Sequence, residues 1–561
     1  MALINDGGVL AAVEEERTSR VKHAKPALVN NSDELPLGAL QACLDIGGIS
    51  LAQVNFIAFS FNPPRRLQHG LKADEPAVQG SWGTLDGETL FHDKLMGLPA
   101  QFRAMGFAGE FVFVDHALSH AASAYYPSSF QESAILSIDG IGEVESTTLA
   151  VGRDGYIEVM EQIGYPHSLG FLWEKVAVYL GMTEYDACKV MSLASFGDPT
   201  RFYDRFRTFV HVGETGFQLD GDFCRFRSGD FSTFETLFGL PALALHQPVV
   251  QDHMDVAAAL QRVTTEILLQ LAQRCHALTG SRQLCLAGGV ALNCVANTEI
   301  FENGPFERIF IQPAANDAGT ALGAALYVYH DRVQRHSGSA FHMRDAYLGP
   351  GYGRDEILAA MARHGVRFSE PDAIEDAVAQ LISQGQVVGW FQGRMEFGPR
   401  ALGNRSLLAD PRDRAMVQRL NRVVKHREDH RPFCPSVLAE HAGGWFRMRR
   451  DAISARYMLM AYPVQPERHE QIPAVVHADG TSRIQMVEEG ANPRYHALIS
   501  RFHELTGVPM LLNTSFNDRE PIVCTPDDAI RTFLRTEIDY LALGDFLLRR
   551  SDNVSATGDR A

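Results

Sequence analysis

The stretch from Phe111 to Tyr126 reads Phe-Val-Phe-Val-Asp-His-Ala-Leu-Ser-His-Ala-Ala-Ser-Ala-Tyr-Tyr, and it decides the predicted fold. The apolar run Phe111–Val114 is typical of a strand, and the alanine-rich run after it is typical of a helix. His116 and His120 lie four residues apart, so both imidazoles lie on one face of that helix. Two imidazoles there can bind one cation at the end of a strand. The alternative is a pair of unrelated histidines.

Two carboxylates follow the ends of other predicted elements. Asp139 comes directly after the apolar run Ala134–Ile138, and Asp317 opens a helical run rich in alanine and glycine. Side chains at element ends can converge from distant segments, so the candidate metal ligands are His116, His120, Asp139 and Asp317. Two imidazoles with one or two carboxylates form a donor set that fits iron(II), manganese or zinc and leaves room for exogenous ligands. We expect iron(II).

Size and composition restrict the class of protein. A chain of 561 residues should fold into at least two domains. Its net charge of -17 argues against general nucleic-acid binding, which needs a basic surface. The eight cysteines form no CxxC pair, which favours a reducing cytosol. No apolar run long enough to cross a membrane and no export signal is visible, so we expect a cytoplasmic protein with no membrane partner.

The order of predicted elements favours an α/β fold. The chain begins with two predicted strands joined by a turn at Asp6-Gly7-Gly8, and strands and helices then alternate. Short hairpins followed by βα units favour a two-lobed ATPase-like fold over one continuous parallel sheet. The turn-rich stretch Gly338–Arg354 is the expected domain boundary, which gives domains at residues 1–340 and 353–550. The other predicted strands cover 54–61, 110–114, 134–138, 147–151, 284–287, 308–311 and 387–391; helices cover 255–278, 374–382 and a segment from 290; the last element covers 540–548, and a frayed tail starts at 551.

A second candidate site in the N-terminal half carries nucleotide-binding features. Gly288-Gly289 follows a predicted strand and opens a helix that leads to Asn293, an arrangement in which the backbone can approach a phosphate or ribose. Packing is an equally good explanation of the two glycines. Lys189 is a cation inside an apolar run, either a ligand-binding residue or a lysine whose stem lies along apolar surface.

Positive charge is concentrated in the C-terminal half. Arg400 and Arg405 lie among glycines, and Lys425 and Arg431 follow soon after. Arginine matches phosphate oxygens with two donors and lysine adds a point charge, so these residues predict a pocket for a polyanion such as ATP or an acyl phosphate. The alternative is a set of surface arginines with acidic partners. Further expected walls of the pocket are Arg483, Asn513 and Ser515.

Taken in order, the motifs resemble the O-carbamoyltransferase family of antibiotic and nodulation-factor biosynthesis. The resemblance covers nearly the whole chain. The motifs that carry it are Glu14-Glu-Glu-Arg17 with Lys22-His23, the His116…His120 stretch, Ile138-Asp-Gly, Ala287-Gly-Gly-Val, Gly398-Pro-Arg-Ala-Leu-Gly-Asn-Arg-Ser, Arg431-Pro-Phe, Asn492-Pro-Arg-Tyr-His and Leu512-Asn-Thr-Ser-Phe-Asn.

The resemblance implies an ASKHA-like (actin/hexokinase-type) N-terminal domain and a smaller YrdC-like C-terminal domain. The C-terminal domain would join carbamoyl phosphate to ATP, with Mg²⁺, to give carbamoyladenylate. The N-terminal domain would bind the adenylate through the metal and pass the carbamoyl group to a hydroxyl, here a sugar hydroxyl of a small natural product. A homodimer would be compatible with this reading. The residues implied in catalysis are Lys425, Arg431 and Ser515, and those implied in binding nucleotide and carbamoyl phosphate also include Lys189, Gly288, Gly289, Asn293, Arg400, Arg405, Arg483 and Asn513.

One departure from the family pattern leaves alternatives open. Members of the family begin with a strand ending in His-Asp-Ala-Ser, and we expect that strand to be missing ahead of Ala2. A catalytically impaired ASKHA-type binding protein is therefore one alternative. Carbamoylation of an acceptor that is not a small molecule is another, although a protein cysteine acceptor predicts CxxC segments and tRNA predicts a basic surface.

Overall fold

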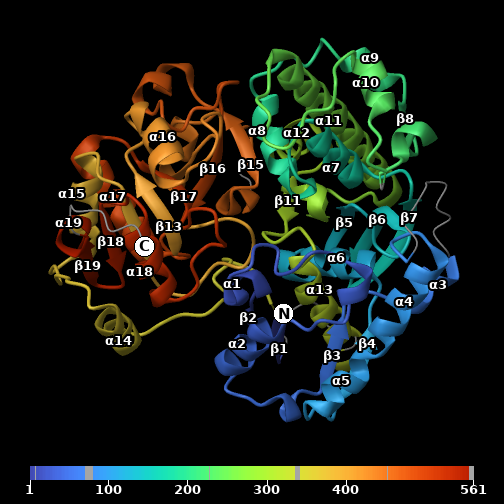
Figure 1. The fold of residues 1–561 in the computed structure, drawn as a ribbon, viewed down its shortest axis with the longest axis horizontal. Coiled ribbons are helices and arrows are strands. Elements are labelled where there is room, and N and C mark those ends of the chain that lie inside the picture. The colour runs from blue at the N-terminus through green and yellow to red at the C-terminus, as the bar shows by residue number, and fades with distance from the viewer. Residues whose placement is uncertain (7, 70–79, 227, 335–340, 451–452, 555–561) are drawn as a thin grey trace. The chain divides into compact units, whose positions relative to one another are not determined.

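The chain folds as a mixed α/β protein with two compact units (Figure 1). The computed structural model describes residues 1–6, 8–69, 80–226, 228–334, 341–450 and 453–554. The first unit contains Met1–Leu10 and Pro26–Met343, and the second contains Ala11–Lys25 and Arg344–Ala561. The predicted α/β class is confirmed. The sequence analysis did not predict that an N-terminal segment belongs to the second unit, and the functional domains at 1–340 and 353–550 remain predictions.

A five-stranded sheet forms the centre of the first unit, in the order β11-β10-β5-β6-β7. β10 is parallel to both β11 and β5, whereas β5, β6 and β7 are antiparallel neighbours. Nearly all of β5 is buried, as expected of a strand covered on both faces, and α6 and α11 both pack on it. The strands are β5 (Glu132–Ile138), β6 (Glu145–Arg153), β7 (Tyr156–Gly164), β10 (Gln283–Ala287) and β11 (Arg308–Ile311); the helices are α6 (His116–Tyr125) and α11 (Gln251–Thr279).

Smaller elements complete the first unit. β3 and β4 form a parallel pair, and β1 with β2 and β8 with β9 form two-stranded sheets. Their bounds, with those of the helices, are β1 (Ala2–Asn5), β2 (Gly8–Ala12), β3 (Phe56–Phe59), β4 (Glu110–Phe113), β8 (Val210–Gly213), β9 (Gly216–Leu219), α2 (Leu37–Gly47), α3 (Pro63–His69), α4 (Leu85–Met96), α5 (Leu98–Ala104), α7 (Leu169–Tyr179), α8 (Ala187–Ala194), α9 (Tyr203–Arg207), α10 (Ser232–Phe238), α12 (Cys294–Asn303) and α13 (Ala318–Val328).

An eight-stranded sheet forms the second unit, in the order β15-β16-β14-β17-β13-β12-β18-β19. The β14–β16 and β12–β18 pairs are parallel and the others antiparallel. α15 packs on α17, and α14 packs on α18. The elements are α1 (Glu15–Ser19), α14 (Arg354–His364), α15 (Ile374–Ser383), β12 (Val388–Phe391), β13 (Arg405–Ala409), α16 (Ala415–Arg419), β14 (Cys434–Leu438), β15 (Met460–Pro463), β16 (Thr481–Val487), α17 (Pro493–Thr506), β17 (Met510–Ser515), α18 (Pro526–Arg535), β18 (Tyr540–Leu543), β19 (Phe546–Arg549) and α19 (Arg550–Asn553).

Most predicted elements are present within a few residues, and three predictions were wrong in detail. The helix expected from residue 290 begins at Cys294, because a 3-10 turn precedes it and the Asn293 side chain caps it by accepting from the backbone N–H of Ala296 (3.1 Å). The run 540–548 divides into two strands around Gly544, which has a φ of +61°. The tail expected to be frayed from residue 551 instead starts within α19. Gly7 of the predicted turn, residues 338–340 of the predicted boundary and residues 555–561 lie outside the described residues.

Candidate functional site

Four side chains from three elements meet at one end of the central sheet in the first unit. His116 and His120 belong to α6, Asp139 directly follows β5, and Asp317 directly precedes α13. One potential ligand atom from each of the four lies within 4.8 Å of the others. The Asp139 carboxylate is 3.2 Å from His116 Nε2 and 3.3 Å from His120 Nε2, and the Asp317 carboxylate is 3.7 and 3.6 Å from the same atoms. We call these four residues the metal cluster.

Both histidines present Nε2 to the carboxylates. His116 Nδ1 lies 3.1 Å from the carbonyl oxygen of Ser60, which can only accept, so Nδ1 carries a proton and Nε2 is available as a ligand. The His120 ring is only 1% exposed, and neither of its nitrogens forms a hydrogen bond to a described residue. A buried imidazole without such a partner is costly, and a metal ion at Nε2 would satisfy it. The donor set therefore fits a divalent transition metal.

The same carboxylates hold protons on the metal-free rings. Burial alone would lower the His116 pKa, but the hydrogen bond that its ring donates to Asp139 and the charges of Asp317, Asp139 and Glu143 raise it to about 10. For His120, burial again opposes Asp139 and Asp317, and the net direction of the pKa is upward. Metal binding must therefore displace protons from the cluster.

The glycine pair after β10 orients Asp139. The backbone N–H of Gly289 donates to Asp139 Oδ1 (2.9 Å), which leaves Oδ2 facing the histidines. Gly288 has a φ of +87°, and a Cβ there would lie 2.1 Å from the carbonyl oxygen of Ile138. Only glycine allows this approach of β10 to the end of β5. These contacts give the glycine pair a role in the metal cluster, and its predicted contact with a nucleotide remains a prediction.

A buried carboxylate that the sequence analysis missed anchors the start of α6. Glu143 accepts from the backbone N–H of His116 (3.0 Å to Oε1) and from that of Asn62 (2.7 Å). Burial raises the pKa of Glu143. Arg65 lies beside this carboxylate and also pairs with Asp115 and Glu145. No spacing in the sequence links these residues, since they come from separate helices, strands and loops.

Glu174 is a second acid that the sequence analysis missed. It lies one helical turn after Gly170 on α7, and a Cβ at Gly170 would lie 2.8 Å from the carbonyl oxygen of Asp139. Burial and the charges of Asp139 and Asp317 raise the pKa of Glu174 to about 8. The carboxylates of the metal cluster therefore disfavour a further negative charge at Glu174.

The remaining predicted residues of the first unit have local partners. Asn293 caps α12, and its amide exchanges two hydrogen bonds with Gln261 (3.0 and 3.1 Å). Lys189 Nζ lies 3.1 Å from Asp186 one turn earlier. These contacts give Asn293 a structural role, and a contact of either residue with a nucleotide remains a prediction.

In the second unit, three of the predicted polyanion-binding residues lie on one face of the large sheet: Arg483, Asn513 and Ser515. The Asn513 amide on β17 donates to Ser436 Oγ (2.8 Å) on β14 and to Gln485 Oε1 (3.1 Å) on β16. Alternate residues of a strand share a face. Ser515, Cys434 and Arg483 are each two residues from one of those three and so lie on the same face. We call the predicted residues here the cationic cluster: Arg400, Lys425, Arg431, Arg483, Asn513 and Ser515.

Lys425 is the most buried charge of the cationic cluster, with 2% of the residue exposed. Its Nζ donates to the hydroxyl of Ser515 (3.1 Å) and to Oδ1 of Asn517 (2.7 Å), and to the carbonyl of Ser515. Burial and the nearby charges of Arg427 and Arg431 lower the Lys425 pKa well below the ordinary value. No carboxylate lies within ion-pair distance among the described residues, so an anionic ligand would restore the charge that burial disfavours.

Cys434 lies in the same cluster and was missed by the sequence analysis. Arg483 Nε donates to its sulfur at 3.2 Å. Burial alone would raise the Cys434 pKa, but Arg483, His477 and Arg400 lower it to about 6. A thiol that ionises so readily records a strongly positive local potential, which is the property that an anion site needs.

Arg405 differs from the other predicted cations. It is fully buried, and its two terminal nitrogens donate to the carbonyls of Gln392, Asn404, Pro350 and Gly393. Its guanidinium also lies 3.6 Å from the centre of the Phe391 ring. These contacts give Arg405 a structural role, so we define the cationic cluster without it; its predicted contact with a nucleotide remains a prediction.

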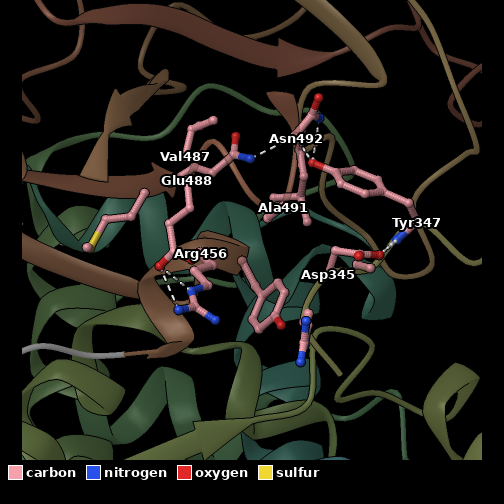
Figure 2. A pocket seen from close by; sticks show the side chains of 13 residues that line it. Asp345, Tyr347, Arg456, Val487, Glu488, Ala491 and Asn492 are labelled. Atoms are coloured by element: carbon pink, nitrogen blue, oxygen red, sulfur yellow. Dashed lines mark hydrogen bonds and ion pairs between the residues drawn. The ribbon is translucent and has the colours of Figure 1, made fainter. Parts of the chain in front are cut away.

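A shallow cavity lies beside this face of the second unit, with about 310 Å³ of empty space that is partly open to solvent. Figure 2 shows Tyr347 directed toward Asn492, and Arg456 paired with Glu488 (2.6 Å). Asn492 donates to the Tyr347 hydroxyl (2.8 Å), which donates to the Leu402 carbonyl (2.8 Å). The cavity walls are therefore held by the loop that carries Arg400.

Comparisons with known proteins identify the family of the chain. Residues 1–326 match the family described as the carbamoyltransferase N-terminus, and residues 379–550 match the carbamoyltransferase C-terminus. An uncharacterized protein of Synechocystis is 38% identical over 98% of this chain and 94% of its own length. The nodulation protein NolNO of Sinorhizobium fredii is 38% identical over 98% of this chain and 78% of its own.

A relative with a named reaction matches a smaller part. The 3'-hydroxymethylcephem-O-carbamoyltransferase of Streptomyces clavuligerus is 32% identical over 65% of each chain. Among solved structures, HypF of T.kodakarensis aligns with 46% of this chain and with 40% of its own length at 14% identity. The TM-score is 0.22, which is too low to support a shared fold. On the two family matches, which together span most of its length, the chain belongs to the carbamoyltransferase family and is a transferase enzyme.

Proposed function

We propose that the protein is an ATP-dependent O-carbamoyltransferase that works in two steps. The second unit converts carbamoyl phosphate, ATP accompanied by Mg²⁺ and water to carbamoyladenylate, with release of phosphate and pyrophosphate. The first unit transfers the carbamoyl group from the adenylate to a hydroxyl of a small molecule, with AMP as the leaving group. The observation that carries the proposal is the convergence of His116, His120, Asp139 and Asp317 in a chain of the carbamoyltransferase family.

The cationic cluster supports the first step. Lys425, Arg400 and Arg483 would neutralise phosphate oxygens, and the buried position of Lys425 strengthens its attraction for an anion. Ser515 and Asn517 hold Lys425 in the absence of ligand, so its ammonium group needs little reorganisation when the anion binds. Arg431 would add charge at the edge of the same site, because its field already acts on Lys425.

The metal cluster supports the second step. We propose that His116, His120, Asp139 and Asp317 hold one divalent metal, iron(II) in preference to manganese or zinc. When bound, such a metal would act as a Lewis acid toward the carbamoyl carbonyl. Glu143 fixes the start of α6 and the Ser60 carbonyl fixes the His116 ring, so both imidazoles are oriented before any ligand arrives. The sheet order β7-β6-β5-β10-β11, an antiparallel meander followed by parallel strands, is the arrangement expected of an ASKHA-like domain.

A small-molecule alcohol is the acceptor that we propose, such as a sugar hydroxyl of a natural product. One relative is named for O-carbamoylation of a hydroxymethylcephem and another as a nodulation protein. The net charge of -17 does not favour a nucleic-acid acceptor. The acceptor can be tested by mass spectrometry with ATP, carbamoyl phosphate and candidate glycosides. Labelling of only amine or thiol analogues would contradict O-transfer.

Two substitutions separate the proposed steps. Lys425→Ala should lower carbamoyladenylate formation by about a hundredfold or more, because a desolvated charged contact in an active site is worth several kcal/mol. His116→Ala should retain adenylate formation and abolish transfer to the acceptor. The measurement is carbamoyl phosphate-dependent exchange of pyrophosphate into ATP for the first step and acceptor mass for the second. Equal loss of the first step in both variants would contradict the division of labour.

A further inference from the structure

The short helix α1 carries two arginines that the proposed reaction does not yet use. α1 (Glu15–Ser19) belongs to the second unit although it lies near the start of the chain. It contains the Glu14-Glu-Glu-Arg17 motif, and Arg20 follows as its C-terminal cap in a left-handed conformation (φ 61°). Both arginines donate to backbone carbonyls more than 350 residues away in sequence.

Arg17 supports the loop that contains Arg400. Its Nη2 donates to the carbonyl of Gly398 (2.9 Å), its Nε donates to Glu14 (2.9 Å), and its Nη1 lies 3.3 Å from Glu16. Only 3% of Arg17 is exposed. Gly398 has a φ of +116°, a conformation that the loop must hold two residues before Arg400.

The inside of this loop is negatively charged. Glu396, 3% exposed, accepts from the backbone N–H groups of Leu402 (2.7 Å), Asn404 (2.8 Å) and Arg405 (3.1 Å). The field of Glu396 acts on Arg17, so the arginine also supplies positive charge next to a buried carboxylate. Arg17 therefore holds the loop by both a hydrogen bond and a charge.

Arg20 supports the loop after β17. Its two terminal nitrogens donate to the carbonyls of Pro521 and Ile522, each at 2.6 Å, and its Nε lies 3.6 Å from Asp528. Within the same loop, the Asn517 amide donates to the Glu520 carbonyl (2.7 Å), and Asn517 Oδ1 accepts from Lys425 (2.7 Å). The position of the Lys425 ammonium thus depends on a loop that Arg20 ties to α1.

We propose that Arg17 and Arg20 are positioning residues for the cationic cluster: α1 joins the loop that carries Arg400 to the loop that orients Lys425. This proposal rests on the proposed function in taking that cluster as the site for the phosphate groups of carbamoyl phosphate and ATP. Neither arginine is placed in contact with the ligand. They act by fixing the backbone on which the contacting side chains depend.

The test uses the full chain with Arg20→Gln, Arg17→Lys and Arg20→Lys. Inorganic phosphate is the probe, its dissociation constant is measured by calorimetry, and pyrophosphate exchange is measured in parallel. Arg20→Gln should weaken phosphate binding and raise the KM for carbamoyl phosphate by about tenfold, since displacement of a binding loop by a fraction of an ångström has effects of this order. Arg17→Lys should have a smaller effect of the same kind, and Arg20→Lys should regain part of the binding because one donor remains.

Arg501→Gln is the matched control, because Arg501 forms an exposed ion pair with Glu504 (2.6 Å) on α17. Metal content at His116 and thermal unfolding are recorded for each variant. Phosphate binding within twofold of the parent in Arg20→Gln and Arg17→Lys would overturn the inference, as would a parent that binds no phosphate. An equal loss of phosphate and metal binding would also overturn it, because the arginines would then support the whole fold. If the unsubstituted protein binds phosphate but forms no adenylate, the proposed function is refuted. The phosphate affinities of the variants would then still decide whether α1 positions the cationic cluster.

Discussion

The metal cluster and the cationic cluster are sites of opposite electrostatic design. In the metal cluster, two carboxylates face two histidines and raise their pKa values, so the cluster favours a positive ligand. In the cationic cluster, burial and neighbouring cations lower the pKa of Lys425, and Arg483 helps to lower that of Cys434. A cation would complete the charge balance of the metal cluster, and an anion would complete that of the cationic cluster. Perturbed ionisation can thus indicate the sign of a ligand before the ligand is known.

The two clusters also differ in what holds them. The metal cluster depends on backbone geometry at element ends, where Gly288, Gly289 and Glu143 place the ligands. The cationic cluster depends on side chains that bond across strands and to loops, as Lys425 does with Ser515. Backbone substitutions should therefore damage the first more, and side-chain substitutions the second.

The largest expected effect is that of Gly288→Ala on the metal cluster. The added Cβ would lie 2.1 Å from the Ile138 carbonyl in a conformation with φ of +87°. We expect a loss of about 3 kcal/mol of unfolding free energy, because the backbone must shift to relieve the clash. We also expect about 10- to 100-fold weaker metal affinity, because that shift would disturb the Gly289 hydrogen bond that orients Asp139. Chemical denaturation and metal titration are the measurements. Gly443→Ala is the control, because no atom lies within 4 Å of its added Cβ. Equal behaviour of the two variants would show that the glycine does not hold Asp139.

Arg405→Lys tests whether Arg405 binds the ligand of the cationic cluster or only stabilises the fold. Lysine cannot make the four carbonyl contacts of the buried guanidinium, so we expect about 2–4 kcal/mol less stability. Phosphate binding by the folded protein should stay within about twofold of the parent, because a group bonded to the fold is not available to a ligand. Denaturation and phosphate calorimetry separate the two effects. Lost phosphate binding with unchanged stability would restore Arg405 as a ligand residue.

The effect confined to the narrowest range of conditions is a pH dependence from Cys434. Its folded pKa of about 6 lies below the ordinary value of 9.0, so between pH 6 and 8 the folded thiol loses its proton while the unfolded thiol keeps it. Stability from this group is therefore present at higher pH and is lost as the pH falls through 6. Relative to Cys434→Ala, the parent should gain up to about 3 kcal/mol of unfolding free energy from pH 6 to 8.

The control for this pH series is Cys285→Ala. Burial raises the pKa of Cys285 to about 12, so its thiol stays neutral across this range in the folded protein. The unfolding free energy of Cys285→Ala should run parallel to that of the parent between pH 6 and 8. A Cys434→Ala curve that also runs parallel would contradict the positive potential inferred for the cationic cluster.

Spacing and element ends were enough to predict the α/β class and to nominate the four residues of the metal cluster. Two histidines four residues apart predict that both side chains lie on one face of a helix. A carboxylate directly after a strand predicts a position at the edge of a sheet. The partners of buried charges could not be predicted. Arg405 and Arg400 belong to the same motif, yet the side-chain hydrogen bonds found for Arg405 all go to backbone carbonyls. Glu143 and Arg17 act on residues far away in sequence, and no periodicity records such contacts.

The chain crosses between its two units three times, after Leu10, after Lys25 and after Met343. This connectivity limits which fragments of the chain can be produced on their own. A fragment from Arg344 onward would contain all eight strands of the large sheet but would leave the carbonyls of Gly398, Pro521 and Ile522 without their arginine donors. The two units are thus not interchangeable modules at the level of the gene. A separately produced second unit would have to carry residues 11–25 as a graft or receive them as a separate peptide.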